Sequence, residues 1–405
     1  MSGPLQGVRV LDFTSVVMGP YATQILGDYG AEVIKVEPPE GDVMRLSGPM
    51  RNPRMGHLFM NVNRSKRSIV VDLKQAAGRE IALALVRRTD VLVYNIRPQA
   101  MARLALSYED VRAVNPRIIY AGAFGFSQCG PYAARPAYDD LIQGMAGIPW
   151  LAKEAGASPP RYAPFILADR VVGLQLFGAV SSALYHRERS GQGQRLDVPM
   201  FEGLASVVLS EHLAGHLFEP PIDKTGYQRS LAHDRRPYPT RDGYICTLIY
   251  TDKHWRRFFE AIGKRDVFES DARFATHGAR VRHIDEVYGF LREIIATRDT
   301  AEWLSVLAAA DIPAAPMYSI DDILADEHLN SIGFFKKNKH PSEGEIFELA
   351  VPTEWSESRP ELRRHAPQLG EHTAEVLQEA GYTPRQIDEY HSAGVIGLLE
   401  RDNVN

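Results

Sequence analysis

The sequence predicts an α/β protein whose first half forms a parallel sheet. Short apolar runs rich in β-branched residues alternate there with helical patterns. The expected strands are 8–13, 31–36, 68–73, 90–94, 117–123 and 195–198, and the expected helices are 21–29, 78–89, 108–114, 140–146 and 170–187. Strands and helices that alternate at this spacing are typical of a parallel sheet covered on both faces. We expect the helix at 170–187, which is apolar on most sides, to be largely buried.

Residues 7–39 carry the clearest signal of this architecture. An apolar strand breaks at Gly19 and Pro20, a helical pattern follows, and a second apolar run closes on Glu37. Units of this kind bind ligands outside the carboxyl ends of their strands. The turn SVVMGP lacks the G-x-G-x-x-G spacing that brings a backbone close to a pyrophosphate, so we do not expect a dinucleotide held as NAD is held.

The second half predicts a smaller unit. The composition shifts between residues 219 and 236, as at a domain crossing, and residues 324–337 resemble another linker. Between them we expect a strand at 244–250 and helices near 255–262, 282–295 and 301–309, and the tail predicts helices at 371–380 and 383–392. The stripe Trp255, Phe258, Phe259 and Ile262 has helical spacing and is interpreted as core.

Composition limits the class of protein. A chain of 405 residues with a net charge of −5 gives no reason to expect a nucleic-acid partner. No uninterrupted apolar stretch approaches membrane-spanning length, and the N-terminal residues do not resemble a secretion signal. Two cysteines, Cys129 and Cys246, are too few for a disulfide framework. We expect a cytoplasmic protein with no membrane partner.

Asp169 is the first candidate for chemistry. It stands at the expected start of the helix at 170–187, where a carboxylate can cap the free backbone N–H groups. The same N–H groups can also hold a reactive carboxylate ionised and oriented, as a nucleophile requires. Asp139 and Asp140 allow a similar choice between helix caps and an acid/base pair. The local sequence leaves both choices open.

Three basic residues follow the expected strands. Lys74, Arg97 and Arg103 lie at or a few residues beyond apolar runs that end at residues 73 and 94. Positive charge at the carboxyl ends of parallel strands suits phosphate, although each residue alone also fits an ordinary solvated surface. His212 and His216 have the i, i+4 spacing of a zinc pair but lack a third ligand nearby, so we expect no metal site.

Seven blocks of sequence together resemble the class III coenzyme A transferases. These proteins include formyl-CoA transferases, carnitine CoA-transferases and the related α-methylacyl-CoA racemases. The blocks are GVRVLDFT–GPYATQILGDYGAEVIKVE, NRSKRSIVVDLK, DVLVYNIRP, NPRIIYAGAFGFSQCGPYAARPAYD, LADRVVG, RSGQGQRLDVPMFE and HAPQLGEHTAEVLQEAGY. The likeness runs through nearly the whole chain and keeps the order of the blocks.

The resemblance implies an unusual architecture. Each subunit would be a ring with a large Rossmann-like domain, built from both chain ends, and a small α+β middle domain, and two rings would interlock in a homodimer. The implied division is residues 1–205 for the first part of the large domain, 206–232 for a linker, 233–317 for the small domain, 318–345 for a second linker, and 346–405 for the part that returns to the large domain.

The resemblance also implies a covalent mechanism. Asp169 matches the family's nucleophile, which attacks an acyl-CoA thioester and passes through an aspartyl anhydride and an aspartyl-CoA thioester. Val16, Lys74, Arg97 and Arg103 match positions that meet coenzyme A in relatives. Coenzyme A and its acyl thioesters would then be substrates, with a small carboxylic acid as acceptor and no permanently bound cofactor. Succinyl-CoA is the donor that the family indicates.

Tyr138 separates the transferases from the racemases. The racemases carry a histidine at this place, whereas a phenol, with an ordinary pKa of about 10, is a poor general base at neutral pH. In a transferase the ring can shape the acyl pocket. Val17 and Pro38 depart from a glutamine and an arginine of the formyl-CoA transferases, and the middle domain lacks their run of glycines, which disfavours formate–oxalate exchange.

Two alternatives to a transferase remain at this stage. They are an α-methylacyl-CoA racemase or isomerase and a non-catalytic acyl-CoA-binding protein. The acceptor acid is not readable from the sequence. His233, Arg235 and Arg236 could meet the second carboxylate of a dicarboxylic acid, or could belong to a solvated linker.

Overall fold

The computed structural model describes residues 3–399, which divide into two compact units. The larger unit contains residues 3–146, 164–205 and 328–399. The smaller unit contains residues 147–163 and 206–327. Segments from both halves of the chain therefore build the larger unit.

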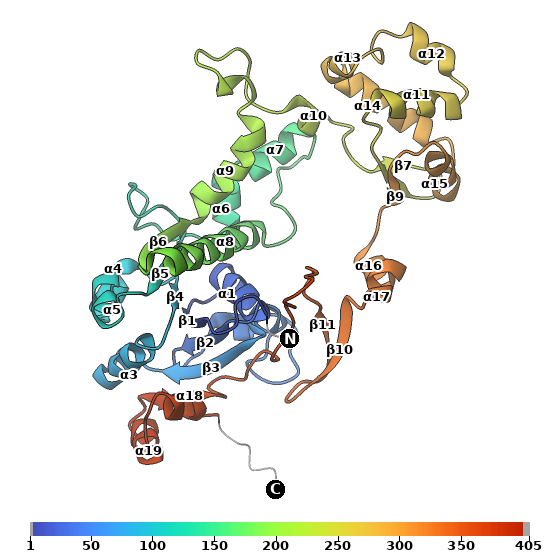
Figure 1. The fold of residues 1–405 in the computed structure, drawn as a ribbon. Coiled ribbons are helices and arrows are strands. Elements are labelled where there is room, and N and C mark those ends of the chain that lie inside the picture. The colour runs from blue at the N-terminus through green and yellow to red at the C-terminus, as the bar shows by residue number, and fades with distance from the viewer. Residues whose placement is uncertain (1–2, 400–405) are drawn as a thin grey trace. The chain divides into compact units, whose positions relative to one another are not determined.

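A seven-stranded sheet forms the centre of the larger unit, in the order β12-β3-β2-β1-β4-β5-β6 (Figure 1). Its strands are β1 (Arg9–Phe13), β2 (Glu32–Glu37), β3 (Lys66–Val71), β4 (Val91–Tyr94), β5 (Ile119–Phe124), β6 (Gln194–Pro199) and β12 (Ile396–Gly397). Strands β1 to β6 are parallel, which confirms the predicted sheet, and β12 pairs antiparallel with β3. The direction of winding reverses between β1 and β4, and sheets with this order bind ligands in the crevice at that point.

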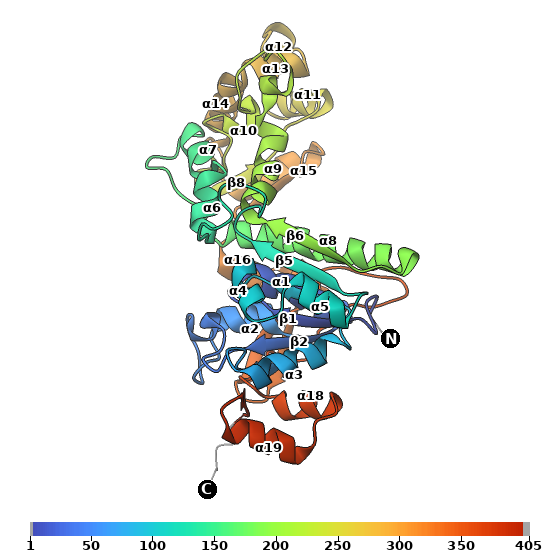
Figure 2. The ribbon, with the colours of Figure 1, turned by 90° about the vertical axis from the view of Figure 1, so that its left-hand side faces the viewer.

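Helices cover both faces of this sheet (Figure 2). Helices α1 (Met18–Asp28) and α8 (Leu167–Ser190) pack together on one face. Helices α3 (Ala76–Val86) and α18 (Thr373–Glu379) pack on the other, where α3 also contacts α5 (Tyr108–Val114). The remaining elements are η1 (Val43–Leu46), α2 (His57–Asn63), α4 (Pro98–Arg103), α6 (Asp139–Met145), α19 (Pro384–Ser392) and the hairpin β10 (Phe335–His340) and β11 (Gly344–Leu349).

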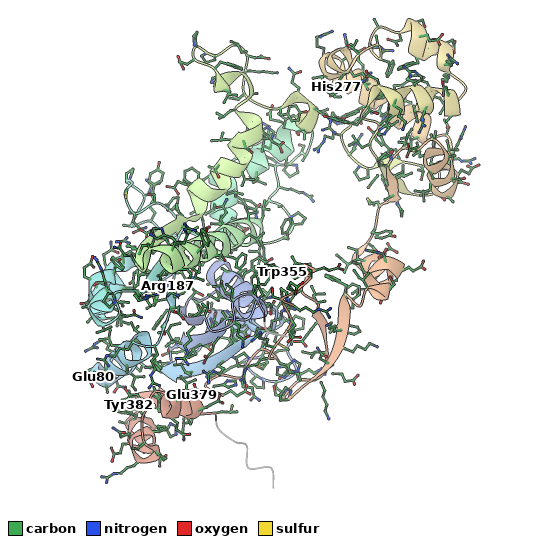
Figure 3. The ribbon with its side chains drawn as sticks, in the orientation of Figure 1. Glu80, Arg187, His277, Trp355, Glu379 and Tyr382 are labelled. Carbon is green, nitrogen blue, oxygen red and sulfur yellow. The ribbon has the colours of Figure 1, made fainter. Side chains whose placement is uncertain are left out.

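Helix α8 is less buried than its composition predicts. Val172, Leu176 and Val180 lie in the core, but Leu174 and Tyr185 on the opposite side are 51% and 66% exposed. An ion pair of 2.9 Å between Arg187 and Asp90 ties α8 to the start of β4 (Figure 3). By length and composition alone, α8 is the one helix among residues 3–399 that could cross a membrane. Its packing against α1 and the sheet is that of a core helix.

The C-terminal segment closes the outer edge of β3. The Arg67 guanidinium contacts the carboxylates of Glu375 and Glu379, at 2.9 and 2.8 Å. Glu379 lies on α18 (Figure 3). The backbone N–H of His372 donates to the Ser68 carbonyl, and the Val70 N–H donates to the Thr373 hydroxyl. These contacts bind main-chain groups of β3 that would otherwise lack partners. Strand β12 pairs with the remaining part of the same edge.

The smaller unit has its own sheet and core. Strands β7 (Tyr238–Pro239), β8 (Tyr244–Thr247) and β9 (Ala314–Pro316) form an antiparallel sheet. Its helices are α7 (Ile148–Glu154), α10 (Gln228–Leu231), α11 (Asp252–Ala261), α12 (Arg265–Ser270), α13 (His277–Arg282), α14 (Ile284–Ile295), α15 (Thr300–Ala309) and α16 (Ile320–Ala325). Trp255, Phe258 and Phe259 are buried, which confirms the predicted aromatic core, and Ile262 of the same stripe packs against it partly buried. The expected helix near 282–295 is α14, which begins at Ile284, because Arg282 ends α13 and His283 separates the two helices.

The expected linkers contain regular structure. Residues 206–232 hold most of α9 (Met200–His212), the turn η2 (Ala214–Leu217) and α10. Residues 318–345 hold α16, α17 (Glu327–Ser331) and β10. Helix α16 begins with a capping box, in which Ser319 and Asp322 bind each other's backbone N–H groups. The sequence SIDD carried this signal, and the sequence analysis overlooked it.

We predict that Phe258→Ala destabilises the smaller unit by about 3–5 kcal/mol, because the substitution leaves a cavity in its core. Phe258 stacks on Trp303, with ring centroids 6.1 Å apart. Denaturant unfolding followed by tryptophan fluorescence measures the change, since Trp255 and Trp303 report from the same core. Tyr244→Ala, at a half-exposed position on β8, is the matched control and should change stability little. Equal effects of the two substitutions would contradict the prediction.

Candidate functional site

A cavity of about 360 Å³ lies where the winding of the large sheet reverses. Its walls come from residues that follow the carboxyl ends of β1, β4, β5 and β6, including Val16, Arg97, Gly125 and Met200. Tyr138 and Asp169 complete the lining, so the whole cavity belongs to the larger unit. This is the edge at which the sequence predicts a ligand.

Asp169 reaches the cavity from the first turn of α8. The helix begins at Leu167, earlier than predicted, and Ile166 occupies the N-cap without a side-chain hydrogen bond. Asp169 is therefore inside the helix, and the interpretation of it as a cap is wrong. Its side chain is 8% exposed and lines the cavity. The backbone N–H of Met18, the first residue of α1, acts on this carboxylate and favours its ionised form.

Burial raises the pKa of Asp169 to about 6, and the nearby Asp139 carboxylate adds to the increase. The Met18 N–H and the positive charge of Arg170 oppose it and favour the ionised form. The carboxylate is therefore mostly ionised at neutral pH, yet it is largely removed from water. A nucleophilic carboxylate needs both properties, because hydration lowers its reactivity.

Asp139 holds the start of α8. One of its carboxylate oxygens accepts the Asp169 backbone N–H at 3.1 Å, and the other accepts from the buried Gln143 side chain at 2.5 Å. Tyr138, not Asp139 or Asp140, is the N-cap of α6, so the prediction that one of these acids caps the helix is wrong. Asp139 instead links the first turns of α6 and α8.

The turn between β1 and α1 is strained at the cavity. Val16 has a φ of +73°, a conformation that a β-branched residue rarely adopts. Its N–H donates to Asp42 at 3.2 Å. Asn95, just after β4, accepts the Ser15 N–H and donates to the Ser15 carbonyl, at 3.1 and 2.8 Å. These contacts hold Val16 in the strained conformation at the cavity wall.

Buried charges lie directly beneath this turn. The Lys35 ammonium donates to Asp42 at 2.9 Å and to the Thr14 carbonyl at 2.8 Å, and it is completely buried. Lys66 forms a second buried pair with Asp12, also at 2.9 Å. Burial opposes ionisation of Asp12, but the charges of Lys66 and Lys35 outweigh it and lower its pKa to about 2. Removal of one partner would leave an uncompensated buried charge.

Gly173 permits a close approach of the two helices. A Cβ atom there would lie 3.0 Å from the Met18 carbonyl oxygen and 3.1 Å from the Tyr21 ring. Helix α8 can therefore bring Asp169 next to the N-terminal end of α1. The positive end of the α1 dipole faces the carboxylate as a result.

The structure brings together four of the six residues that the sequence analysis assigned to the site. Val16, Arg97, Tyr138 and Asp169 line the cavity, and Tyr138 is 71% exposed. Lys74 and Arg103 are exposed outside it, on the loop after β3 and at the end of α4. Sequence reasoning missed the supporting contacts of Asp42 with Val16 and of Asn95 with Ser15, because they join segments distant in the chain. It also missed the contact of Gln143 with Asp139, four residues apart in one helix. Asn95 had a usable signal, since it directly follows an apolar strand.

The structure gives one of the two histidines at i, i+4 spacing another role. His212 accepts a hydrogen bond from the backbone N–H of Tyr227 at 3.2 Å. Within residues 3–399, no group of three or more histidine, cysteine and acidic side chains is placed to hold a metal ion.

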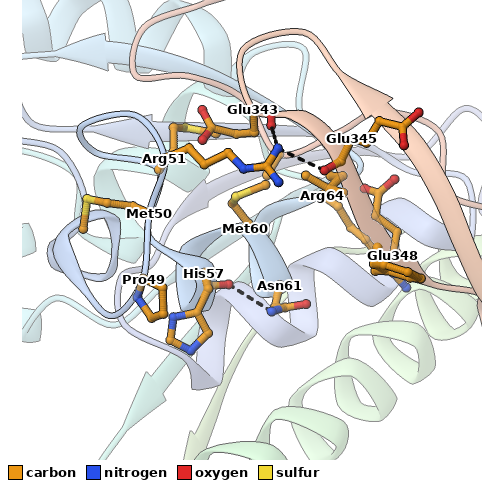
Figure 4. Close-up of a pocket in the computed structure, with 14 residues that line it drawn as sticks. Pro49, Met50, Arg51, His57, Met60, Asn61, Arg64, Glu343, Glu345 and Glu348 are labelled. Carbon is orange, nitrogen blue, oxygen red and sulfur yellow. Dashed lines mark hydrogen bonds between the residues drawn. The ribbon is translucent and has the colours of Figure 1, made fainter. Parts of the chain in front are cut away.

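A second cavity in the larger unit, of about 390 Å³, lies between residues 49–64 and the β10–β11 hairpin (Figure 4). Its charged side chains bind within the protein. Arg51 donates to the Glu343 and Glu345 carbonyls, and Arg64 pairs with Asp28. The Asn61 side chain donates to the His57 carbonyl at 3.0 Å (Figure 4). Asp169 lies in the other cavity, which is therefore the better candidate for chemistry.

The family model described as CoA-transferase family III matches residues 5–373. The chain is 34% identical to an acyl-CoA transferase of Fusarium pseudograminearum, covering 97% of this chain and 88% of that protein. It is 34% identical to a succinate–glutarate CoA-transferase of Agrobacterium fabrum, over 93% and 95% of the two chains. Among solved structures, Rv3272 of Mycobacterium tuberculosis matches with a TM-score of 0.80 at 31% identity, over 92% of this chain and 99% of that one. A CAIB/BAIF family protein of Brucella suis matches with a TM-score of 0.79 at 31% identity, over 94% and 100%.

We predict that Asp169→Asn stabilises the protein at alkaline pH. The pKa of Asp169 rises from its ordinary value of 3.8 to about 6 on folding, so the native carboxylate binds a proton that the unfolded one has lost. The free energy of unfolding of the wild type should therefore fall by about 3 kcal/mol as the pH rises from 4 to 6, because the contribution of this bound proton is lost. Asparagine does not ionise and avoids this loss.

Urea unfolding at a series of pH values measures the effect. The variant should be more stable than the wild type at pH 8, and the difference should disappear near pH 4. Asp140→Asn, at an exposed position in the adjacent helix, is the control and should show no such trend. A difference that does not vary with pH would show that the pKa of Asp169 is not raised.

Proposed function

Because the chain belongs to CoA-transferase family III, we propose that it moves coenzyme A from an acyl-CoA thioester to a small carboxylic acid, with Asp169 as the covalent nucleophile. The observation that carries the proposal is the position of Asp169. It is a largely buried carboxylate in the cavity at the sheet's reversal point, with its pKa near 6 and the first N–H of α1 directed at it.

The first half of the proposed reaction loads coenzyme A onto the protein. The Asp169 carboxylate attacks the thioester carbonyl, the C–S bond breaks, and coenzyme A leaves as a thiolate while an aspartyl anhydride forms. The thiolate then attacks the aspartyl carbonyl of the anhydride. The donor acid leaves as a carboxylate, and an aspartyl-CoA thioester remains.

The second half repeats these steps in the opposite direction. The acceptor carboxylate attacks the aspartyl thioester and releases the thiolate, which then attacks the acyl carbonyl of the acceptor. The products are the new acyl-CoA and free Asp169. The N–H of Met18 supports this proposal, because a donor fixed beside the aspartyl carbonyl can stabilise the oxyanion that forms in each step.

The remaining parts of the site have proposed roles. Val16 and Arg97 line the path of coenzyme A, and Tyr138 shapes the acyl pocket. Lys74 and Arg103 are proposed to meet the phosphates at the distal end of coenzyme A, where it extends beyond the cavity. We further propose an interlocked cytoplasmic homodimer. The donor to test first is succinyl-CoA, which the likeness to a succinate–glutarate CoA-transferase supports.

We predict that an acyl-enzyme forms at Asp169. The protein is mixed with succinyl-CoA and quenched with hydroxylamine, and its peptides are mapped by mass. A hydroxamate at Asp169 is expected, because both the anhydride and the thioester react with hydroxylamine. Asp169→Ala should fold normally and lose coenzyme A transfer completely. Asp140→Ala should retain both hydroxamate formation and coenzyme A transfer. Substantial turnover by Asp169→Ala would overturn the proposed nucleophile.

We predict that Arg97→Gln raises the KM for acyl-CoA roughly tenfold, because it removes a charge-assisted contact made equally in the ground and transition states. The kcat should change little. Arg117→Gln is the matched control. Arg117 is exposed and precedes the amino end of β5, whereas the cavity lies at the carboxyl ends of the strands. Steady-state kinetics at constant ionic strength measures both values. An unchanged KM for Arg97→Gln would refute its assignment to coenzyme A.

A further inference from the structure

The smaller unit contains a cavity of about 260 Å³ whose wall combines arginines with apolar side chains. Arg229 comes from α10, and Arg235 and Arg236 come from the segment between α10 and β7. The other lining residues are Pro237, Tyr238, Cys246, Thr247, Leu248, Ile249, Tyr288 and Leu291. Three separate parts of the unit therefore converge on one cavity.

The apolar part of this cavity is a rigid surface. Tyr238, Ile249 and Leu291 are 4%, 4% and 1% exposed and belong to the aromatic core of the unit. Leu248, next to them, is 41% exposed and remains available for contact. A hydrocarbon chain could pack here, whereas an inorganic anion would gain nothing from these side chains.

The arginines bring more positive charge than the protein neutralises. Asp234 accepts from Arg236 at 2.8 Å and from Arg292 at 2.9 Å, so one carboxylate serves two guanidinium groups. The Nε of Arg229 donates to the Tyr288 hydroxyl at 3.0 Å, and its guanidinium lies 5.3 Å from the centre of the Tyr250 ring. In the described part of the chain, neither Arg229 nor Arg235 forms an ion pair with a carboxylate. Guanidinium groups of this kind bind carboxylates in a forked geometry.

We infer that this cavity binds a short-chain dicarboxylate, with its carboxylates at the arginines and its carbon chain on the apolar surface. Two arginines that form no ion pair within residues 3–399 suit a dianion better than a monoanion. The sequence left Arg235 and Arg236 between a solvated linker and a carboxylate site, and their place in the cavity wall favours the second. His233 does not line the cavity.

Cys246 makes the inference testable without any activity assay. The chain has two cysteines, both exposed, and Cys246 lines the cavity whereas Cys129 does not. The full-length protein is treated with iodoacetamide, with and without glutarate, and the alkylation rate of each cysteine is measured by mass spectrometry. Well above the dissociation constant, glutarate should slow alkylation of Cys246 roughly tenfold. The rate at Cys129 should not change.

Two matched ligands test the chemistry of the site. Pentanoate has the same chain length with one carboxylate, and inorganic phosphate is an anion without a carbon chain. Weaker protection by both supports the inference. Equal protection by pentanoate would overturn the assignment to a dicarboxylate, and equal protection by phosphate would overturn the assignment to an organic acid. An absence of protection by glutarate would overturn the site itself.

Two substitutions separate this inference from the proposed function. Arg229→Gln should weaken protection by glutarate roughly tenfold, as loss of a charge-assisted hydrogen bond predicts. Arg256 is exposed on α11 and does not line the cavity, so Arg256→Gln should leave the protection by glutarate unchanged. In Asp169→Asn, glutarate should still slow the alkylation of Cys246 as it does in the wild type. Protection that survives in Asp169→Asn while no hydroxamate forms in the wild type would keep the binding site and refute the transferase mechanism.

Discussion

The buried pair of Lys35 and Asp42 supports the arrangement of the cavity that contains Asp169. Asp42 accepts the N–H of Val16 with one oxygen and the Lys35 ammonium with the other, and Lys35 also binds the Thr14 carbonyl. A strained turn with a left-handed valine would relax if these partners were lost. Because the turn leads directly into α1, the direction of the first N–H groups of that helix depends on the same pair. Two buried charges thus fix the place at which a third, on Asp169, is stabilised.

The sequence predicted the parallel sheet better than it predicted the contacts that support the candidate site. Strand and helix patterns are local, so the parallel sheet and the position of Asp169 near the start of α8 were readable. The contacts of Asp42 with Val16 and of Asn95 with Ser15 depend on how distant turns meet, which no local pattern encodes. The exposed side of α8 was also unpredictable, because its composition is apolar on most sides.

The surroundings of Asp169 balance two opposite requirements. Burial and Asp139 make the carboxylate more basic, whereas Met18 and Arg170 keep it ionised near neutral pH. Asp139 serves both this balance and the geometry, since the oxygen that receives the Asp169 N–H also carries the charge that raises the pKa. Positioning and reactivity are therefore coupled through one side chain, and neither can be changed there alone.

Strand β12 has a consequence for how the protein is made. Residues 66–71 form β3 early in synthesis, but the segments that bind its outer edge lie at residues 370–397. At ribosomal rates of about 5–20 residues per second, this edge stays open for tens of seconds while the chain emerges. An apolar strand with free N–H and carbonyl groups invites pairing with other nascent chains. Pairing of residues 370–397 with β3 therefore ends the period in which this edge is open to such contacts.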